Sequence, residues 1–485
     1  MSTPNMNIFE QPHIRIGVWG LGVTGKSIIT YIKKKYPHVT LVACAKQCDE
    51  ITQKLLLDLN IPFFLQEQLN QFAHEVDYLI PSPGIDVHAF PEVLAQCVQE
   101  LDLFAQIWRG KTIAVTGSIG KTSTVHLLHR LIESTGKKVF LGGNVGIPLF
   151  DLLAEHNTPD TYAILELSSF QLELSSQLKP DVAVITNIFP NHLDRHKTLD
   201  AYTAAKYKLF EHLPAHAQAL VPFELVEYFR SRDFAQRPLN VFFSQKPTPT
   251  ELAVLNYKEH EYNQSHKLAG EHDREHACGH TCVLFIEQKN TRICELVDGS
   301  SIKIGDYDPS ISFPQTWLIG LSVCSLLGLK PQAIDTTHMI PAHRGELVET
   351  INEVAYYNDS KSTVMQATIA STEKLLLKHP RVILLLGGMS KGVDRTPFIK
   401  TLNNKPVFII CFGKEASALA SICKSCSIPH TTADTLQQAC IFAYKEAQPH
   451  EAVLLSPGGT SFDLFANYQE RGHTFVTLIK TIAKQ

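Results

Sequence analysis

The chain has 485 residues, 44% of them hydrophobic and 19% charged, with a formal net charge of −4 at pH 7. This length favours about three domains, and the weak negative charge excludes a general nucleic-acid binder, which needs a basic surface. No apolar run approaches the ~20 residues of a membrane span, the N-terminal residues lack the pattern of a signal peptide, and the eleven cysteines show no disulfide framework. We therefore expect a cytoplasmic protein that does not insert into a membrane.

Residues 14–104 alternate short apolar strands, at 14–20, 39–45 and 78–81, with helical patterns. This alternation predicts a small doubly wound α/β domain over residues 1–104. The first strand runs into GLGVTGKS, residues 20–27, which fits both a dinucleotide-binding fingerprint and a literal P-loop. NAD(P) is disfavoured because the second strand ends in Lys46 rather than in an acidic residue. A phosphate or diphosphate of another nucleotide stays allowed.

A second glycine loop, TGSIGKTS at residues 116–123, follows the apolar strand 111–117 and opens an amphipathic helix. Glycines let the backbone wrap closely around phosphate oxygens, and the helix N-terminus points N–H groups at the anion. Lys121 adds a cation and the Thr122 hydroxyl suits a Mg²⁺ ligand. The loop therefore predicts a nucleoside triphosphate site and a protein that uses ATP.

Further apolar runs at 138–143, 162–167 and 181–187 predict parallel strands of a central domain over residues 105–340. Glu166 lies at the end of one strand, where ligands bind in open parallel sheets, and is a candidate Mg²⁺ ligand. The alternative is a buried carboxylate that only caps the next helix. His192, with Asp194, follows another strand and is a candidate for a second metal or a phosphate group.

Residues 225–312 are polar and weakly periodic, which indicates a loop-rich or short-stranded insertion. It contains a dense set of soft ligands: His272, His276, Cys278, His280 and Cys282. Zn²⁺ is conceivable there. The spacing fits no standard zinc site, which favours a polar surface hairpin without metal.

From residue 341 the α/β pattern returns, with strands at 354–359, 381–388, 406–413 and 452–459, and it predicts a third domain over 341–485. Arg344, Lys361, Lys391 and Ser461 lie near strand ends and together suit a dianionic amino acid. The predicted fold class is thus α/β in three domains, each with a mostly parallel sheet flanked by helices. The first and third are Rossmann-like, and the central one is a P-loop domain.

Taken together, motifs along nearly the whole chain resemble those of the Mur ligases. They are, in chain order, GLGVTGKS (20–27), PSPGI (81–85), TGSIGKTS (116–123), GGNVG (142–146), ELSSFQLE (166–173), HLDRH (192–196), AAK (204–206), HRGELV (343–348), NDSK (358–361), LLLGGMSKG (384–392) and the run 461–475. NDSK and ELSSFQLE are specific to the D-glutamate-adding branch. The resemblance implies a monomeric ATP-dependent amide ligase of peptidoglycan precursor synthesis, which adds D-glutamate to UDP-N-acetylmuramoyl-L-alanine through an acyl phosphate.

The resemblance also implies roles for matching residues. The ATP site comprises Gly117, Ser118, Ile119, Gly120, Lys121, Thr122, Ser123, Arg344 and Asp359. The UDP-sugar site comprises Gly22, Val23, Thr24, Gly25, Ser82, Pro83, Gly84, Asn144 and His192. The D-glutamate site comprises Lys361, Thr363, Lys391, Ser461 and Tyr468. One Mg²⁺ takes Thr122 and Glu166, a second takes His192 and Lys206 as a carbamate, and the catalytic residues are Lys121, Lys206, His192, Asp359 and Lys361.

Four features depart from the family pattern, one of which is the missing acidic residue on the uracil side after the second strand. Ile119 stands where the P-loop usually has Asn, Asn191 replaces the Asp before the metal-site histidine, and the Gly-x-His-Asn-x-x-Asn signature is absent at 310–317. Two alternatives therefore stay open. One is a divergent Mur-type ligase with another amino-acid substrate, and the other is a nucleotide-binding paralogue that has lost catalysis.

Overall fold

The computed structural model describes residues 7–232, 234, 239–255, 283–287, 292–297, 300–307, 313–332, 334 and 342–484. The chain forms two compact units. The first unit comprises Met1–Ile188 and Thr203–Met339, and the second comprises Phe189–Tyr202 and Ile340–Gln485. The predicted zinc-ligand set, His272, His276, Cys278, His280 and Cys282, lies outside the described residues.

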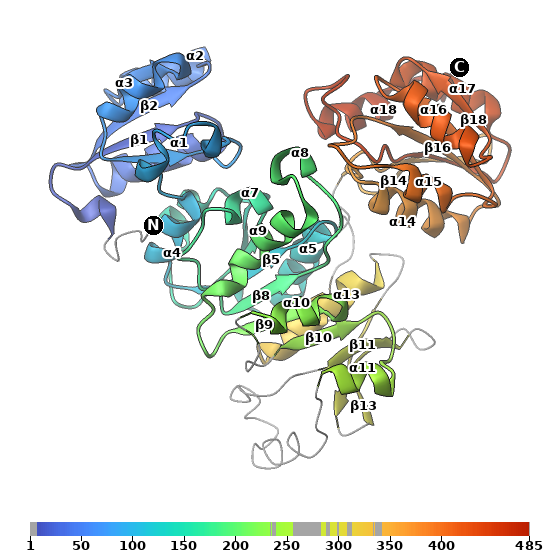
Figure 1. The fold of residues 1–485 in the computed structure, drawn as a ribbon, viewed down its shortest axis with the longest axis horizontal. Helices are drawn as coiled ribbons and strands as arrows, with labels where there is room; N and C mark the ends of the chain where they lie inside the picture. Colours follow the sequence, from blue (N-terminus) through green and yellow to red (C-terminus); the bar gives the residue numbers. More distant parts are fainter. Residues whose placement is uncertain are drawn as a thin grey trace. The chain divides into compact units, whose positions relative to one another are not determined.

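The first unit begins with a four-stranded parallel sheet of order β3-β2-β1-β4, drawn in blue in Figure 1. Its elements are β1 (Arg15–Trp19), α1 (Val23–Lys35), β2 (Thr40–Ala45), α2 (Glu50–Asp58), β3 (Phe63–Leu65), α3 (Leu69–His74) and β4 (Tyr78–Pro81). Both central strands are buried almost throughout, because helices cover both faces of the sheet. The helix α4 (Glu100–Ile107) then leads to the second sheet.

The second sheet of the first unit has nine strands in the order β13-β12-β11-β10-β9-β8-β5-β7-β6. The strands are β5 (Lys111–Thr116), β6 (Lys138–Gly143), β7 (Thr161–Glu166), β8 (Val182–Ile185), β9 (Gln218–Pro222), β10 (Asn240–Phe243), β11 (Val283–Glu287), β12 (Arg292–Val297) and β13 (Ser300–Asp306). Among the described strands, the pairs β11–β12 and β12–β13 are antiparallel, and the other pairs of this sheet are parallel. The described parts of residues 225–312 therefore extend the same sheet.

Helices cover this sheet on both faces, and alternate residues of β5 show the two sides. Ile113 and Val115 pack in one core with α5 (Lys121–Glu133) and α13 (Pro314–Leu326), whereas Ala114 packs in the other. The other described helices of the first unit are α6 (Leu149–Glu155), α7 (Ser169–Leu172), α10 (Val226–Arg230) and α11 (Pro249–Val254). The helix α8 (Leu193–His196) belongs to the second unit, and α9 (Leu199–Glu211) begins in the second unit and continues in the first.

The two sheets of the first unit are joined through α1 and α6. The Ser27 hydroxyl on α1 donates a hydrogen bond of 2.6 Å to Oδ1 of Asp151 on α6. Beside it, the rings of Tyr31 and Phe150 meet edge to face with centroids 5.2 Å apart. Both rings belong to one apolar core that continues from the first sheet into the second.

Glu100, at the start of α4, is a buried carboxyl group close to this joint. Burial, and secondly the negative charge of Asp151, raise the pKa of Glu100 to about 8. Because this folded-state pKa lies above the unfolded value of 4.5, the folded protein binds the proton more tightly. The free energy of unfolding therefore falls as pH rises from about 4.5 to 8.

Replacing this residue by its neutral isostere, Glu100→Gln, is expected to flatten that pH dependence. At pH 9 the variant is expected to be more stable than the parent protein by on the order of a few kcal/mol, since one pKa unit corresponds to about 1.4 kcal/mol. Urea unfolding at pH 5, 7 and 9 measures the effect. Glu92→Gln, at an exposed position nearby, is the control, and parallel pH profiles of the parent protein and Glu100→Gln would contradict the prediction.

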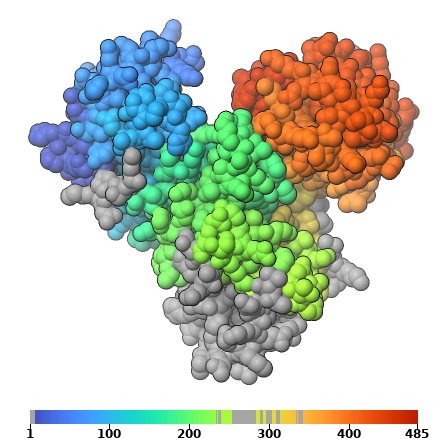
Figure 2. All heavy atoms as spheres, viewed as in Figure 1, coloured from blue at the N-terminus to red at the C-terminus, as the bar shows by residue number. Residues whose placement is uncertain are grey.

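The second unit contains a six-stranded sheet of order β14-β15-β19-β16-β17-β18, in which only β14 is antiparallel to its neighbour. The strands are β14 (Glu346–Ile351), β15 (Val354–Asn358), β16 (Val382–Gly387), β17 (Val407–Phe412), β18 (His430–Ala433) and β19 (Ala452–Leu455). The helices are α14 (Met365–Leu376), α15 (Thr396–Lys400), α16 (Ala416–Ser425), α17 (Leu436–Glu446) and α18 (Tyr468–Ile482). In the space-filling view of Figure 2 this part is orange to red, and its central strands are buried.

The α/β fold class with mostly parallel sheets is confirmed. The proposed limits of three domains stay predictions. In the part of the chain that the structure describes, no helix is both long enough and apolar enough to cross a membrane.

Candidate active site

The predicted ATP loop, residues 117–123, joins β5 to the N-terminus of α5. Gly117 has a φ of +137°, and a Cβ at this position would collide with the Thr186 hydroxyl. At Gly120 no heavy atom lies within 4 Å of the place that a Cβ would take. Lys121 folds over the loop, with Nζ donating to the carbonyls of Gly117 at 2.6 Å and Ser118 at 3.1 Å. The loop thus offers open space beside a helix N-terminus and a lysine, the setting in which phosphate binds.

Two residues that the sequence analysis did not single out hold this loop. The Asn187 side chain accepts from the backbone N–H of Ile119 at 3.0 Å and donates to its carbonyl at 3.2 Å. The Thr186 hydroxyl donates to the same carbonyl at 2.7 Å, and the backbone carbonyl of Asn187 accepts from the N–H of Ser118 at 3.0 Å. Every one of these bonds uses backbone atoms of the loop. The shape of the loop therefore does not depend on the side chain of Ile119.

Removing the side-chain clamp with Asn187→Ala is expected to raise the KM for ATP about tenfold, because two hydrogen bonds that order the loop are lost. Steady-state kinetics at varied ATP measures the change. Asn157→Ala is a matched control, since Asn157 clamps another loop of the same unit through the N–H of Arg109 and the carbonyl of Ile107. An equal rise of KM in both variants would contradict a specific role for Asn187.

Glu166 ends β7 and is almost fully buried. The Asn144 amide donates to its Oε1 at 2.7 Å, and the Asn144 backbone N–H donates to the Glu166 carbonyl at 2.8 Å. The cap of the following helix α7 is Ser168, whose hydroxyl accepts from the N–H of Gln171. The interpretation of Glu166 as a helix-capping carboxylate is therefore wrong. Asn144, predicted to contact the UDP-sugar, is bonded to Glu166.

Lys206 lies on α9 and is completely buried beside the P-loop strand, with Nζ 3.4 Å from the Thr116 hydroxyl. Burial first, and then the charge of Lys121, move the pKa of Lys206 well below its usual value, while Glu166 opposes the shift. A buried lysine with a lowered pKa is in part a neutral amine, which is nucleophilic. Lys121, Glu166 and Lys206 are thus grouped at the carboxyl edge of the second sheet.

His192 belongs to the second unit, whereas Thr122, Glu166 and Lys206 belong to the first. It begins the short helix α8 with a left-handed φ of +54°. No group of three or more His, Cys, Asp or Glu side chains able to hold a metal was found among the described residues. The predicted Mg²⁺ sites do not depend on such a group, because they also use a hydroxyl and a modified lysine.

The predicted UDP-sugar segments follow the paired parallel strands β1 and β4: residues 22–25 are the cap and first turn of α1, and residues 82–84 come after β4. The two connections are joined just before α1, where the Ser82 hydroxyl donates to the Gly20 carbonyl at 3.1 Å. A Cβ at Gly25 would collide with that same carbonyl, whereas space at Gly22 and Gly84 is open. These loops therefore form one open edge of the first sheet, where Val23 is exposed.

The P-loop pattern at residues 20–27 does not act as a second P-loop in this structure. Ser27, at the position of the Mg²⁺-binding hydroxyl in that pattern, is buried and bonded to Asp151. Lys26 lies 3.7 Å from the carboxylate of Asp49, which caps α2. The lysine and the hydroxyl of that pattern thus both have partners within the protein.

The predicted amino-acid site lies at the carboxyl edge of the sheet of the second unit. Asp359 follows β15, and its Oδ2 accepts from the hydroxyls of Ser362 at 2.6 Å and Ser456 at 2.9 Å. Burial raises the pKa of Asp359, while these hydrogen bonds and the charge of Arg344 lower it. The Lys361 ammonium lies 4.0 Å from the centre of the Tyr468 ring.

The other predicted amino-acid ligands lie at neighbouring strand ends. Lys391 follows β16 with a left-handed φ of +55°, and its Nζ donates to Oδ1 of Asn191 at 3.1 Å. Ser461 follows β19 and is buried, and Thr363 is half-buried.

Two buried arginines beneath these loops were missed by the sequence analysis. Arg471 donates to Ser360 and to the carbonyl of Gly459. Arg395 donates to the carbonyls of Gly387 and Gly388. Arg471 lies inside the run 461–475, which the sequence analysis identified as a motif without assigning a role to this arginine. Nothing in the sequence around Arg395 indicates burial.

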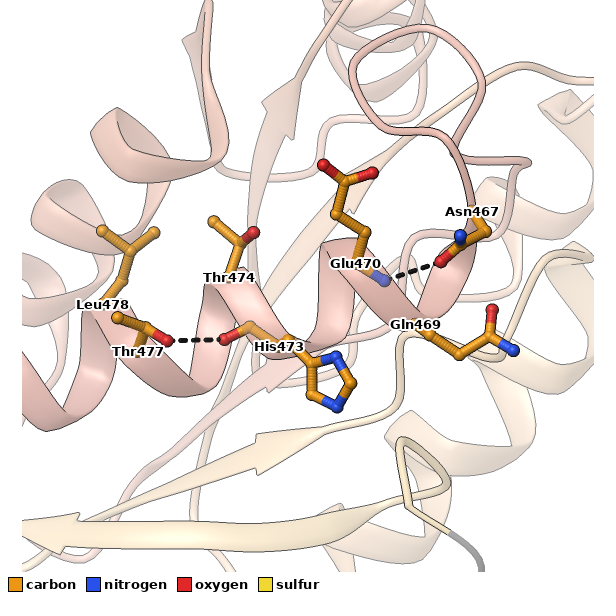
Figure 3. Close-up of a pocket in the computed structure, with 7 residues that line it drawn as sticks. All are labelled: Asn467, Gln469, Glu470, His473, Thr474, Thr477 and Leu478. Carbon is orange, nitrogen blue, oxygen red and sulfur yellow. Dashed lines mark hydrogen bonds between the residues drawn. The ribbon is translucent and has the colours of Figure 1, made fainter. Parts of the chain in front are cut away.

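An open pocket of the second unit lies on the N-terminal half of α18 (Figure 3). Its lining comes from this helix and its cap: Asn467, Gln469, Glu470, His473, Thr474, Thr477 and Leu478. Asn467 caps the helix by accepting from the N–H of Glu470 at 2.8 Å, and Thr477 bonds back to the His473 carbonyl. None of the predicted site residues lines this pocket.

Comparisons with known proteins agree with this arrangement. The Mur ligase middle domain matches residues 115–278. UDP-N-acetylmuramoylalanine--D-glutamate ligase of Desulfotalea psychrophila is 31% identical over 481 residues, which cover 97% of this chain and 96% of that protein. The enzyme of the same name from Koribacter versatilis is 30% identical over 483 residues, with coverage of 97% and 98%.

Solved structures share the fold. The Thermotoga maritima MurF ligase in complex with ADP has a TM-score of 0.55 at 16% identity, covering 98% of this chain and 96% of that chain. A pseudomurein peptide ligase type C from Methanothermus fervidus also gives 0.55, at 13% identity and coverage of 97% and 100%. The chain therefore belongs to the Mur ligase family, with the UDP-N-acetylmuramoylalanine--D-glutamate ligases as its full-length relatives.

Proposed function

We propose that this protein is the ATP-dependent ligase that joins D-glutamate to UDP-N-acetylmuramoyl-L-alanine in peptidoglycan precursor synthesis. The observation that carries the proposal is the grouping of Lys121, Glu166 and Lys206 at one sheet edge. The family supplies the reaction class, and relatives of that name match along nearly the full length.

In the proposed reaction the P-loop holds the phosphates of ATP. The alanyl carboxylate takes the terminal phosphoryl group to give an acyl phosphate, and the amine of D-glutamate then displaces phosphate to form the amide. Backbone N–H groups at the start of α5 and the Lys121 ammonium stabilise the negative charge that develops on the phosphoryl oxygens. Lys121 must leave the carbonyls of Gly117 and Ser118 for the phosphates.

The residues at the P-loop fit a Mg²⁺ ion. Thr122 offers a hydroxyl oxygen at the first turn of α5 and Glu166 a buried carboxylate, which are the hard oxygen donors that Mg²⁺ prefers. When bound, the ion supplies charge neutralisation and orientation of the phosphates. The Asn144 amide orients the Glu166 carboxylate by donating a hydrogen bond to its Oε1.

For the second ion we propose His192 and Lys206, the latter as a carbamate. The neutral amine of Lys206 attacks the carbon of CO₂, an N–C bond forms as one C=O π bond opens, and one proton leaves the nitrogen for solvent. The neutral side chain thereby becomes an anion, which is attracted to the Lys121 ammonium. A carbamate also supplies oxygen donors where an unmodified lysine has none.

For the substrates we propose the loops 22–25 and 82–84 as the UDP-sugar site, and Lys361, Thr363, Lys391, Ser461 and Tyr468 as the D-glutamate site, with Arg344 and Asp359 contributing to ATP binding. The support is their common position at the carboxyl ends of parallel strands, where open α/β sheets bind ligands. Two cationic side chains in one site favour a dicarboxylic amino acid.

The test is phosphate release by the purified protein with ATP, Mg²⁺, UDP-N-acetylmuramoyl-L-alanine and one amino acid at a time. Turnover is expected with D-glutamate and not with L-glutamate, D-aspartate or meso-diaminopimelate. Turnover with another of these amino acids instead would replace the proposed substrate. Binding of the UDP-sugar without any turnover would identify a binding protein and overturn the proposal.

A further inference from the structure

The turn that carries Lys391 is held by a buried arginine. Arg395 is 3% exposed, and its guanidinium donates to the Gly388 carbonyl at 2.8 Å and to the Gly387 carbonyl at 3.2 Å. The same group lies 3.4 Å from Oε2 of Glu415. A planar guanidinium fixes two carbonyls in a defined geometry, which a lysine cannot do.

Glu415 binds Ser390, two residues after Gly388 in the same turn. Its Oε1 accepts from the backbone N–H of Ser390 at 3.1 Å and from the Ser390 hydroxyl at 3.3 Å. Arg395 therefore donates hydrogen bonds to carbonyls of the turn, and Glu415 accepts one from a backbone N–H of the same turn. The two side chains also form an ion pair with each other. Lys391 follows directly, in the left-handed conformation that most residues avoid.

The pair also reaches the loop of Ser461. Met389 and Thr460 exchange two backbone hydrogen bonds of 3.0 Å, which join the Lys391 turn to the loop after β19. Fixing residues 387–390 thus fixes the backbone beside Ser461. One ion pair supports two of the five predicted ligands of the amino acid.

We propose that Arg395 and Glu415 are positioning residues that set the affinity for the acidic amino-acid substrate by aiming Lys391. The inference rests on the proposed function, in which Lys391 binds the substrate. Neither side chain touches the substrate in this proposal. They act by fixing the position of the Lys391 ammonium relative to the substrate carboxylate. A small displacement of such a charged contact lowers the affinity.

The experiment compares Arg395→Met with the parent protein in steady-state kinetics. The KM for D-glutamate is expected to rise about tenfold or more, because a charge-assisted hydrogen bond loses its alignment. The KM for ATP is expected to change less than about twofold. Glu415→Gln, at a less buried position, is expected to raise the D-glutamate KM as well. This variant replaces Arg395→Met in the comparison if Arg395→Met does not fold.

The matched control is Arg381→Met. Arg381 precedes β16 at the opposite end of the same strand and pairs with Glu446 at 2.6 Å and Glu451 at 3.6 Å. This variant also loses an arginine ion pair of the second unit, and its D-glutamate KM is expected to stay at the parental value. Equal KM shifts in the Arg381 and Arg395 variants would reduce the effect to general destabilisation and overturn the proposal.

A double-mutant cycle tests whether Arg395 acts through Lys391. In a Lys391→Ala background, Arg395→Met is expected to raise the D-glutamate KM much less than it does in the parent background, and the remaining rise is attributed to the loop of Ser461. Additive effects would overturn the proposal.

Hydrogen exchange separates this proposal from the proposed function. Amides 387–392 are expected to exchange faster in Arg395→Met and not in Arg381→Met, whatever amino acid the protein uses. Unchanged exchange in both variants would overturn the positioning role even if D-glutamate is the substrate.

Discussion

Lys206→Ala is expected to lower kcat about a thousandfold or more while the protein stays folded. The side chain is buried beside Glu166 and close to the half-buried Lys121, where preorganised charge has a large effect on phosphoryl transfer. Alanine removes the proposed carbamate and any ion that it holds. The measurement is single-turnover amide formation with saturating ATP and UDP-sugar, beside a thermal unfolding profile.

Lys208→Ala is the matched control, since Lys208 lies one half-turn away on the same helix, is exposed and pairs with Glu211 at 3.1 Å. Its activity is expected to stay within about twofold of the parent protein. Mass spectrometry under native conditions, or ¹³C NMR after exposure to labelled bicarbonate, is expected to show the carbamate in the parent and the Lys208 variant only. A fully active Lys206→Ala protein would remove this lysine from the mechanism.

Glu166→Gln is expected to reduce kcat a hundredfold or more and to weaken the dependence of activity on Mg²⁺ concentration. Glutamine keeps the volume and an oxygen that accepts from Asn144, so the change removes little besides the negative charge. A hard divalent cation binds a neutral amide oxygen more weakly than a carboxylate. Activity measured over a Mg²⁺ titration, with EDTA as the zero point, reports both effects.

The comparison variant is Glu155→Gln on α6 of the same unit, whose side chain is exposed. It removes an equal charge without touching the P-loop, and its Mg²⁺ titration is expected to overlay that of the parent protein. If Glu166→Gln also overlays the parent, Glu166 is a structural residue that only anchors Asn144.

Much of the fold was predictable because its main strands are buried on both faces. Such strands read as continuous apolar runs, and those of β1, β5, β8, β16 and β19 each end near a glycine or polar residue. Strands β3, β9 and β18 were missed, since they are short or lie among polar residues. For residues 225–312 the sequence allowed short strands, but it did not predict the bounds of β10 to β13 or their addition to the central sheet, because the segment reads as polar.

The candidate site was predictable only where a side chain sits next to a recognisable strand end. Glu166 and Lys121 are of this kind, and the structure groups them with Lys206, whose position on a helix carried no signal of its own. Arg395 and Asn187 escaped because their roles depend on partners that are distant in sequence: Arg395 reaches Glu415, and Asn187 reaches Ile119. The serine of the misleading motif at 20–27 is explained only by Asp151, more than a hundred residues away.

The second unit is not a contiguous piece of the gene, and this has a consequence for recombination. Residues 189–202 are grouped with residues 340–485, and Asn191 accepts from Lys391 across some two hundred positions of the chain. A chimaera that exchanges only the C-terminal third between relatives therefore mixes two parental versions of one folding unit. Exchanges that carry both segments from the same parent are expected to yield soluble, active hybrids more often. The unit to exchange between relatives is therefore a pair of separate chain segments rather than one continuous segment.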